Sequence, residues 1–445
     1  MGRDRDSMKI TYLILIAGLV LGAGLVAGCS TPGEAGDALK IGVVASMTGP
    51  ASTTGRDMWQ SAQLAADEIN AEGGITVGGK NMTIELVQGD DESTREGGIK
   101  AVTKMITDDR VDLLVGGFSS AVVTAHQSIV AEKGVPYIVT GASSPTITRR
   151  TDINTSMIFH HCPTTDDYGA KTTIFVDEVI RPAVNAQFGR PEAQPLRLAV
   201  IYQDSPYGKG VLEAVNETIA ENRLPIEIVA EEGYKMGETD FRSLLTSVKA
   251  TRPDVAYPAA FLNEQVPMLT QARRDVGLDT IFLAVECNDD PDYYRGLGQY
   301  GDASVIESRF SPYAVPRGAI SARVEQYRND YQSRYGGFPG MMGASTYEGV
   351  YVAAAAVEKA GTAEKAEVIT ALTTIAVPEM IESMEGGVIS FANPFRESRS
   401  NLYMEQLHWD AATQELRPTI VWPDELKETE FQLPGWYRPG ERVTR

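Results

Sequence analysis

Apolar runs typical of buried strands alternate with amphipathic segments over the first part of the chain, from Leu39 to about residue 160. After the first apolar run, Met58, Ala62, Ala65 and Ile69 recur at helical spacing, which predicts a helix with one apolar face. The predicted strands are residues 39–47, 81–88, 111–117 and 135–141, and the predicted helices are residues 56–70, 95–108 and 121–134. Strands that are apolar throughout and alternate with helices predict a parallel sheet covered on both faces.

The same alternation restarts at Leu196, so the chain predicts a second α/β unit. We expect the first passage between the units near residues 158–164. Thr239 is predicted to cap one helix of the second unit. Further along, residues 319–337 and 345–361 have helical patterns. Two apolar runs around a turn then predict a hairpin over residues 402–422.

The N-terminal residues have the pattern of a secretory signal, with basic residues before an apolar run over residues 10–26. The stretch "LVAGC" ending at Cys29 resembles the bacterial lipobox, which implies cleavage after residue 28 and a lipid on Cys29. A transmembrane anchor is the alternative, because the run approaches the length of a membrane span, roughly 17–25 residues. Both interpretations place the bulk of the chain outside the cytoplasm, and residues 29–38 are predicted to be a tether.

Charge and cysteine content narrow the possible partners. The chain of 445 residues carries 60 acidic against 40 basic side chains, and this excess argues against nucleic acid as a partner. Cys162 and Cys287 could pair in an oxidising compartment or remain two buried thiols.

Enzymatic motifs are absent from the sequence. It contains neither a P-loop nor a strand-linked G-x-G-x-x-G, and its serine turns lack the G-x-S-x-G pattern. A serine nucleophile also needs a base, and histidines are few. His126 is predicted to lie on a helix surface, and adjacent His160 and His161 would face opposite sides of a strand. We therefore predict no catalytic residues, no cofactor and no metal site, and an extracellular serine hydrolase has little support.

Two strand-to-helix turns, "VGGFSSA" and "VTGASSP", stand out. In each, glycine is followed by adjacent serines, and both lie at strand carboxyl ends, where α/β sheets gather ligands. Ser119 or Ser120 could cap the following helix, or help its free N–H groups hold a carboxylate. A second turn of the same kind, carrying Ser143, favours a shared anion site.

The second unit supplies complementary groups at its own strand ends. Glu286 could meet an ammonium, and Tyr207 and Phe261 could form aromatic walls. Taken singly, Glu286 is better explained as a solvated loop acid, and Tyr207 and Phe261 can be explained as a loop aromatic and a core side chain. A carboxylate site, a facing acid and aromatic walls together predict a pocket for a free amino acid.

The ordered motifs also resemble a known family. "LKIGVVASMTGP", "ADEINAEGGI", "GDDEST", "VGGFSS", "GVPYIVTGASSP", "YQDSPYGKG" and "QARRDVGL" are similar to the leucine/isoleucine/valine-binding proteins, the type I periplasmic binding proteins of ABC transporters. The similarity runs from about residue 39 to about residue 410. It implies two doubly wound parallel-sheet lobes, joined by three crossovers, that close around a ligand like a Venus flytrap.

The resemblance implies roles for individual residues. Ser120 would bind the ligand carboxylate, Gly141 would offer its carbonyl to the ammonium, and Ser143 would contact both groups. From the second lobe, Glu286 would pair with the ammonium and Tyr207 would face the ligand. Phe118, Phe261 and Tyr207 would supply apolar contact, and Ser119 would cap the helix or line the pocket.

Three positions depart from the family pattern. Phe261 replaces a tyrosine, and Thr54 stands where an aromatic residue is common, which implies a wider or more polar side-chain pocket. Thr165 occupies a position that the family fills with an acid, for which Asp166 or Asp167 could substitute.

The resemblance also implies a domain plan and partners. Residues 39–160 and 308–395 would form one lobe, residues 161–307 and 396–424 the other, and residues 425–445 an extension without a counterpart. The chain would be an extracytoplasmic lipoprotein that delivers an amino acid, branched-chain or otherwise apolar, to the permease and ATPase subunits of an ABC transporter. A ligand-sensing receptor of the same fold, and an amide or aromatic carboxylate as ligand, are the alternatives.

Overall fold

The first sheet is built from the N-terminal third of the chain. In the computed structural model, residues 38–437 are described, so the predicted signal, lipobox and tether up to residue 37 lie outside the described part. The six strands have the order β2-β3-β1-β4-β5-β6, and all neighbours pair in parallel except β2 with β3. The strands are β1 (Ala38–Ala45), β2 (Ile75–Val77), β3 (Lys80–Asp90), β4 (Leu113–Gly116), β5 (Tyr137–Val139) and β6 (Ile158–His160).

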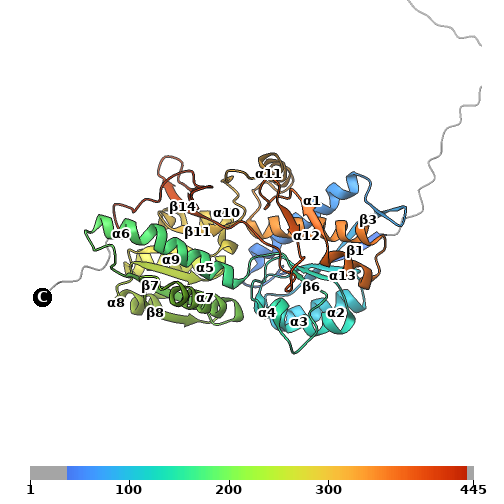
Figure 1. Cartoon of the computed structure of the whole chain (residues 1–445), viewed down its shortest axis with the longest axis horizontal. Coiled ribbons are helices and arrows are strands. Elements are labelled where there is room, and N and C mark those ends of the chain that lie inside the picture. Colours follow the sequence, from blue (N-terminus) through green and yellow to red (C-terminus); the bar gives the residue numbers. More distant parts are fainter. Residues whose placement is uncertain (1–37, 438–445) are drawn as a thin grey trace, which may run out of the picture. The chain divides into compact units, whose positions relative to one another are not determined.

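Helices cover both faces of this sheet (Figure 1). On one face α1 (Ser52–Ala71) packs against α12 (Met341–Ala360), and on the other α2 (Arg95–Thr107) packs against α3 (Ser120–Lys133). The predicted apolar stripe of α1 is buried at Met58, Ala62, Ala65 and Ile69, as the helical spacing required.

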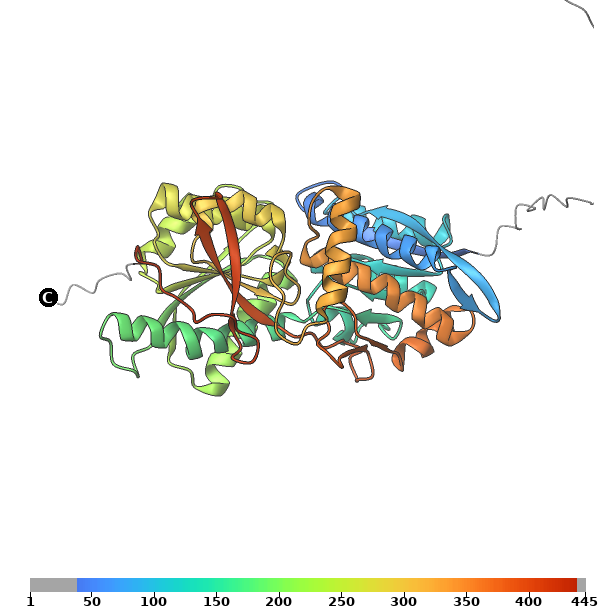
Figure 2. The ribbon, with the colours of Figure 1, turned by 90° about the horizontal axis from the view of Figure 1, so that it is seen from above.

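The second sheet has seven strands in the order β15-β14-β11-β10-β9-β7-β8. The strands are β7 (Leu196–Gln203), β8 (Ile226–Tyr234), β9 (Val255–Ala259), β10 (Ile281–Ala284), β11 (Val305–Ser308), β14 (Tyr403–Asp410) and β15 (Glu415–Trp422). Its first five strands in chain order are parallel, and β14 and β15 form the predicted antiparallel hairpin at its edge. Figure 2 shows α5 (Thr165–Phe175) and α7 (Pro206–Asn222), in green, on one side, and α9 (Leu262–Gln271) and α10 (Pro291–Leu297), in yellow, on the other.

The chain passes between the sheets three times. It leaves the first sheet after β6, and it returns after β11 to form α11 (Ser321–Tyr335), α12 and α13 (Lys365–Thr373). It then crosses again to add β14 and β15 to the second sheet. The predicted fold class of two doubly wound α/β units is therefore confirmed, while the residue ranges assigned to the lobes stay a prediction.

The remaining elements are short. They are α4 (Thr146–Arg149), η1 (Val176–Ile180), α6 (Arg181–Gln187), α8 (Arg242–Ala250), η2 (Ala272–Val276), η3 (Glu286–Asn288), η4 (Gly298–Gly301), β12 (Ala376–Pro378) and β13 (Val388–Ser390). In the part of the chain that the structure describes, no helix combines the length and the apolarity needed to cross a membrane.

Two local predictions are wrong. The predicted cap Thr239 lies before α8, which begins at Arg242 with Phe241 at its N-cap position. His126, predicted on a helix surface, is fully buried, because α2 packs over α3 and its Gly98 leaves room for the imidazole ring. Burial lowers the pKa of His126 to about 3, so the ring is neutral.

Candidate functional site

The first serine turn needs both of its glycines. Gly116 and Gly117 have φ angles of +104° and +84°, in the region that side chains rarely adopt. A Cβ at Gly116 would lie 2.4 Å from the Val44 carbonyl oxygen, and one at Gly117 would lie 2.2 Å from the Tyr137 hydroxyl. The turn is therefore packed tightly against β1 and β5, and this packing places Phe118 and the two serines at the end of β4.

The two serine turns are joined by a hydrogen bond. Ser119 occupies the N-cap position of α3, but its side chain does not cap the helix. The Ser120 hydroxyl accepts a hydrogen bond from the Ser144 backbone N–H at 3.1 Å, so it ties one turn to the other. A Cβ at Gly141 would lie 3.2 Å from the Gly117 carbonyl oxygen, which shows how closely the turns approach.

Aromatic rings from both units meet beside these turns. Phe118, after β4, lies 4.5 Å from Phe261, which is the N-cap residue of α9 in the second unit. Tyr207, in the first turn of α7, stacks on Phe261, with ring centroids 5.2 Å apart and an interplanar angle of 23°. All three rings are buried, so they form an apolar wall shared by elements of the two sheets.

Glu286 lies two residues after the end of β10 and is also buried. Its carboxylate accepts a hydrogen bond from the Tyr168 hydroxyl and forms an ion pair with Arg309 Nε at 2.7 Å. Burial raises the pKa of Glu286 to about 7, while Arg309 opposes the shift. The acid predicted to meet a ligand ammonium therefore already has one cationic partner.

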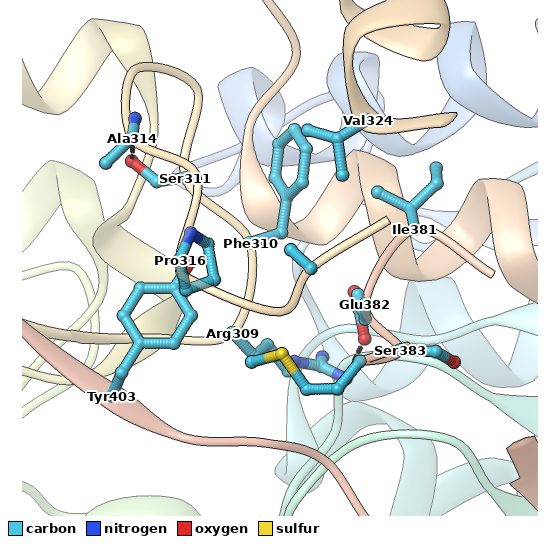
Figure 3. Close-up of a pocket in the computed structure, with 12 residues that line it drawn as sticks. Arg309, Phe310, Ser311, Ala314, Pro316, Val324, Ile381, Glu382, Ser383 and Tyr403 are labelled. Carbon is cyan, nitrogen blue, oxygen red and sulfur yellow. Dashed lines mark hydrogen bonds and ion pairs between the residues drawn. The ribbon is translucent and has the colours of Figure 1, made fainter. Parts of the chain in front are cut away.

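Arg309 is shared between two carboxylates. It follows β11 on the second passage between the sheets, and its Nη1 donates to Glu382 Oε2 at 2.8 Å. Figure 3 shows Arg309 and Glu382 facing each other at this second contact. All three side chains are almost fully buried, so one guanidinium neutralises two acids and the cluster needs a proton or a further cation for balance.

One group of side chains has the residue types of a metal site. Ligand atoms of His161, Glu348 and Glu382 lie within 4.8 Å of one another, and all three residues are buried. These atoms are already engaged, because His161 contacts Ser398 Oγ and Glu348 Oε2, each at 3.0 Å, and both Glu382 oxygens accept hydrogen bonds, from Arg309 and Ser345. The guanidinium takes the place that a cation would need, so we assign no metal to this group.

The predicted residues converge on a small cavity. Its lining combines groups from both serine turns with groups from α5, α7, α9 and the end of β10. The lining residues are Phe118, Gly141, Ser143, Tyr168, Tyr207, Phe261, Val285, Glu286 and Cys287. The cavity volume is about 10 Å³, which is room for about one water molecule, so the aromatic rings fill most of the space.

Other predicted residues lie outside the cavity lining. Ser119 and Ser120 are buried without lining it, and Thr54 is buried in α1. Asp166 is half-exposed and pairs with Arg149 at 2.7 Å, while Asp167 accepts hydrogen bonds from the N–H and hydroxyl of Thr164. The structure therefore does not bring either acid to the cavity.

Two residues of the site were not predicted. Tyr168 belongs to the "TTDDYG" stretch but follows the acids on which the prediction concentrated. Arg309 follows a short strand without any flanking motif, so only the fold reveals its contact with Glu286. Cys162 and Cys287 are both buried free thiols.

Comparison with known proteins identifies the family of this chain. A family model described as periplasmic binding protein matches residues 38–408. The chain belongs to the periplasmic binding protein family. An amino acid binding protein of Pseudomonas aeruginosa is 27% identical to this family member over 312 residues, covering 70% of this chain and 76% of the relative.

Solved structures share the fold of this periplasmic binding protein. A branched-chain amino acid transporter substrate binding protein from Streptococcus pneumoniae, in complex with isoleucine, has a TM-score of 0.70 at 23% identity, with 86% of this chain and 100% of that chain covered. A solute binding protein of an ABC transporter from Rhodopseudomonas palustris, in complex with 3,4-dihydroxy benzoic acid, has a TM-score of 0.69 at 22% identity, with 88% and 98% covered.

Proposed function

We propose that this protein is the extracytoplasmic solute-binding component of an ABC transporter and that it binds a free amino acid, branched-chain or otherwise apolar. The observation that carries the proposal is the convergence of Gly141, Ser143, Tyr207 and Glu286 on one buried cavity with aromatic walls. The names of its relatives support the same ligand class.

Each part of an amino acid has a counterpart in this site. The ligand carboxylate would meet the N-terminal turn of α3 and the hydroxyls of Ser120 and Ser143, because the first N–H groups of a helix lack intrahelical partners. The ammonium would approach the Gly141 carbonyl and Glu286, since a carboxylate oxygen can accept more than one hydrogen bond. Phe118, Phe261 and Tyr207 would contact the apolar side chain.

Ligand entry requires a change of shape. A cavity of about 10 Å³ cannot hold an amino acid, and the Phe118–Phe261 contact closes it. Because Phe118 follows a strand of one sheet and Phe261 a strand of the other, movement of one unit away from the other would separate the rings. We infer that the units open to admit the ligand and close around it.

A thermal-shift screen tests the proposal. Ligands that bind only the folded state raise its melting temperature, so amino acids, amides and aromatic carboxylates can be ranked on the chain from residue 38 onward. An apolar amino acid is expected to give the largest upward shift. If no amino acid shifts the midpoint and an uncharged amide does, the zwitterion model is wrong.

One observation favours a second ligand class, the aromatic carboxylates. Glu286 already has Arg309 as its cationic partner, and the neighbouring wall consists of stacked rings. A benzoate-like ligand would use the carboxylate site and the aromatic wall without supplying an ammonium. Glu286→Gln separates the two ligands, because it should abolish amino acid binding and leave aromatic carboxylate binding nearly unchanged.

We further propose that the protein is a lipoprotein anchored through Cys29 and that it catalyses no reaction. The lipobox-like stretch supports the anchor. The small volume of the cavity and the engagement of Glu286 by Tyr168 and Arg309 support binding without turnover. The permease and ATPase subunits of the transporter would be its partners.

A further inference from the structure

A second, polar cavity shares no lining residue with the proposed ligand site. It has a volume of about 140 Å³ and is lined by α1, by the start of α10, and by the end of α11 with the loop that follows. Its lining residues include two almost fully buried acids, Asp57 from α1 and Asp290 from the N-cap of α10. A volume of this size accommodates several water molecules.

Asp290 is bound on one side only. Its Oδ1 accepts the Asp292 backbone N–H at 2.7 Å and so caps α10. Among the described residues, no donor or cation contacts its Oδ2, although the side chain is 8% exposed and lines the cavity. Asp290 Oδ2 keeps some solvent exposure, so a water molecule, a proton or a cation in the cavity can reach it.

Asp57 repeats this arrangement from the other side. Its Oδ2 accepts the Gly343 backbone N–H at 2.7 Å, and its Oδ1 has no hydrogen-bond partner in the described chain. A Cβ at Gly340 would lie 2.5 Å from Asp290 Oδ2 and 3.1 Å from Asp57 Oδ2. The missing side chain at Gly340 therefore lets the two carboxylates approach each other.

The surrounding charges satisfy this pair only in part. Arg295 lines the cavity and pairs with Asp292, and its charge also opposes the rise in the pKa of Asp290. Arg56 makes no ion pair with either acid in the described part of the chain. Burial and then Asp290 raise the pKa of Asp57 well above its ordinary value, and burial raises the pKa of Asp290 to about 7. When Asp57 and Asp290 are both ionised, the described residues do not supply enough positive charge to balance them.

We propose that Asp57 and Asp290 bind a hydrated divalent metal cation that bridges α1 and α10. Hard cations prefer carboxylate and water oxygens, and a small number of carboxylates with retained waters is the usual arrangement for Mg²⁺. The cavity supplies two carboxylates and the space for those waters. Since α1 belongs to the first unit and α10 to the second, the cation would hold these elements together.

Calcium and magnesium titrations of the purified protein test this site. At a hundredfold excess over Kd, cation binding should raise the melting temperature by about 3 °C. The shift should disappear in Asp290→Asn, since asparagine keeps the α10 cap but loses the charge. It should persist in Asp67→Asn, a matched change at an exposed acid of the same helix α1 that lies outside the cavity.

Terbium luminescence gives a second measurement that does not depend on stability. Tyr331 and Tyr335 line the cavity, so bound Tb³⁺ should be sensitised and then displaced by Ca²⁺, in wild type and Asp67→Asn but not in Asp290→Asn. The proposal is overturned if about 10 mM Ca²⁺ or Mg²⁺, well above the weak end of extracellular calcium sites, leaves the melting temperature unchanged. It is also overturned if all variants respond equally. Neither outcome bears on ligand binding at the first cavity.

Discussion

At Ser120 one hydroxyl connects two turns, and this connection makes a specific prediction. Ser120→Ala removes the acceptor of the Ser144 N–H and a proposed partner of the ligand carboxylate. We expect ligand affinity to fall by roughly 1–3 kcal/mol, the cost of an unmet buried polar group. Titration calorimetry measures this change, with Ser144→Ala as the control, because the Ser144 hydroxyl contacts Thr146 rather than the cavity. Unchanged ligand affinity together with lower protein stability would show that Ser120 connects the two turns without binding the ligand.

Glu286 predicts how stability depends on pH. Its pKa of about 7 in the folded state exceeds its ordinary value of 4.5, so the folded protein holds more protons than the unfolded chain between these values. Protonated Glu286 therefore stabilises the folded state at pH 4.5, and this stabilisation is lost as the pH rises through 7. Glu286→Gln removes it, so the unfolding free energy of the variant relative to wild type should increase by up to about 3 kcal/mol from pH 4.5 to 8.

Urea unfolding at a series of pH values measures this difference. Glu217→Gln, at an exposed position of α7, is the matched control and should track wild type throughout. A Glu286→Gln difference that stays constant with pH would contradict the shifted ionisation.

The sequence allowed part of this site to be predicted residue by residue. Gly141, Ser143, Tyr207 and Glu286 stand at strand ends, and parallel sheets bring such positions together, as found. Arg309 could not be predicted, because its contact with Glu286 depends on the path between the sheets. The burial of His126 was missed for a similar reason, since helical spacing does not show that α2 covers this part of α3.

At the scale of the elements, the first serine turn predicts a difference between two glycines that flank α3. Gly117 and Gly134 both have positive φ angles. A Cβ at Gly117 would collide with the Tyr137 hydroxyl, whereas a Cβ at Gly134 would have no neighbouring atom within 4 Å in the described chain. Gly134→Ala should cost about 1–2 kcal/mol for the left-handed backbone alone. Gly117→Ala should cost at least about 2 kcal/mol more, because the turn must also shift. Equal losses in chemical denaturation would contradict the steric argument.

The helices and strands were largely predictable, whereas their ends were not. Periodicity identified α1 and the β14–β15 hairpin because each has a regular apolar pattern. The short strand β2 and the start of α8 were missed. β2 has only three residues, and Phe241 at the α8 N-cap is not a residue type that signals a helix start.

At the scale of the whole molecule, the proposed anchor can be tested in cells. Cys29→Ser should prevent lipid attachment, so the protein should move from the membrane fraction to the soluble extracytoplasmic fraction. Mass spectrometry of the mature N-terminus should show a lipid on Cys29 in wild type. Wild-type protein that retains residues 10–26 and carries no lipid on Cys29 would instead support the transmembrane anchor.

The repeated strand–helix alternation predicted the two-unit architecture. The proposed ligand, in contrast, is inferred from groups that both units contribute. Phe118 and Ser143 come from the first unit, and Tyr207, Phe261 and Glu286 come from the second. In the proposed function, the balance between Glu286 and Arg309 would decide whether the ligand needs an ammonium. The ion pair between these two residues is visible only in the folded structure.

Titration calorimetry with L-leucine and its deaminated analogue, 4-methylpentanoate, tests the central claim most directly. We expect saturable binding of one leucine per chain and at least tenfold weaker binding of the analogue. In Glu286→Gln, the difference in affinity between leucine and the analogue should disappear. Binding of 4-methylpentanoate or benzoate with no measurable binding of leucine or any other amino acid would contradict the central claim.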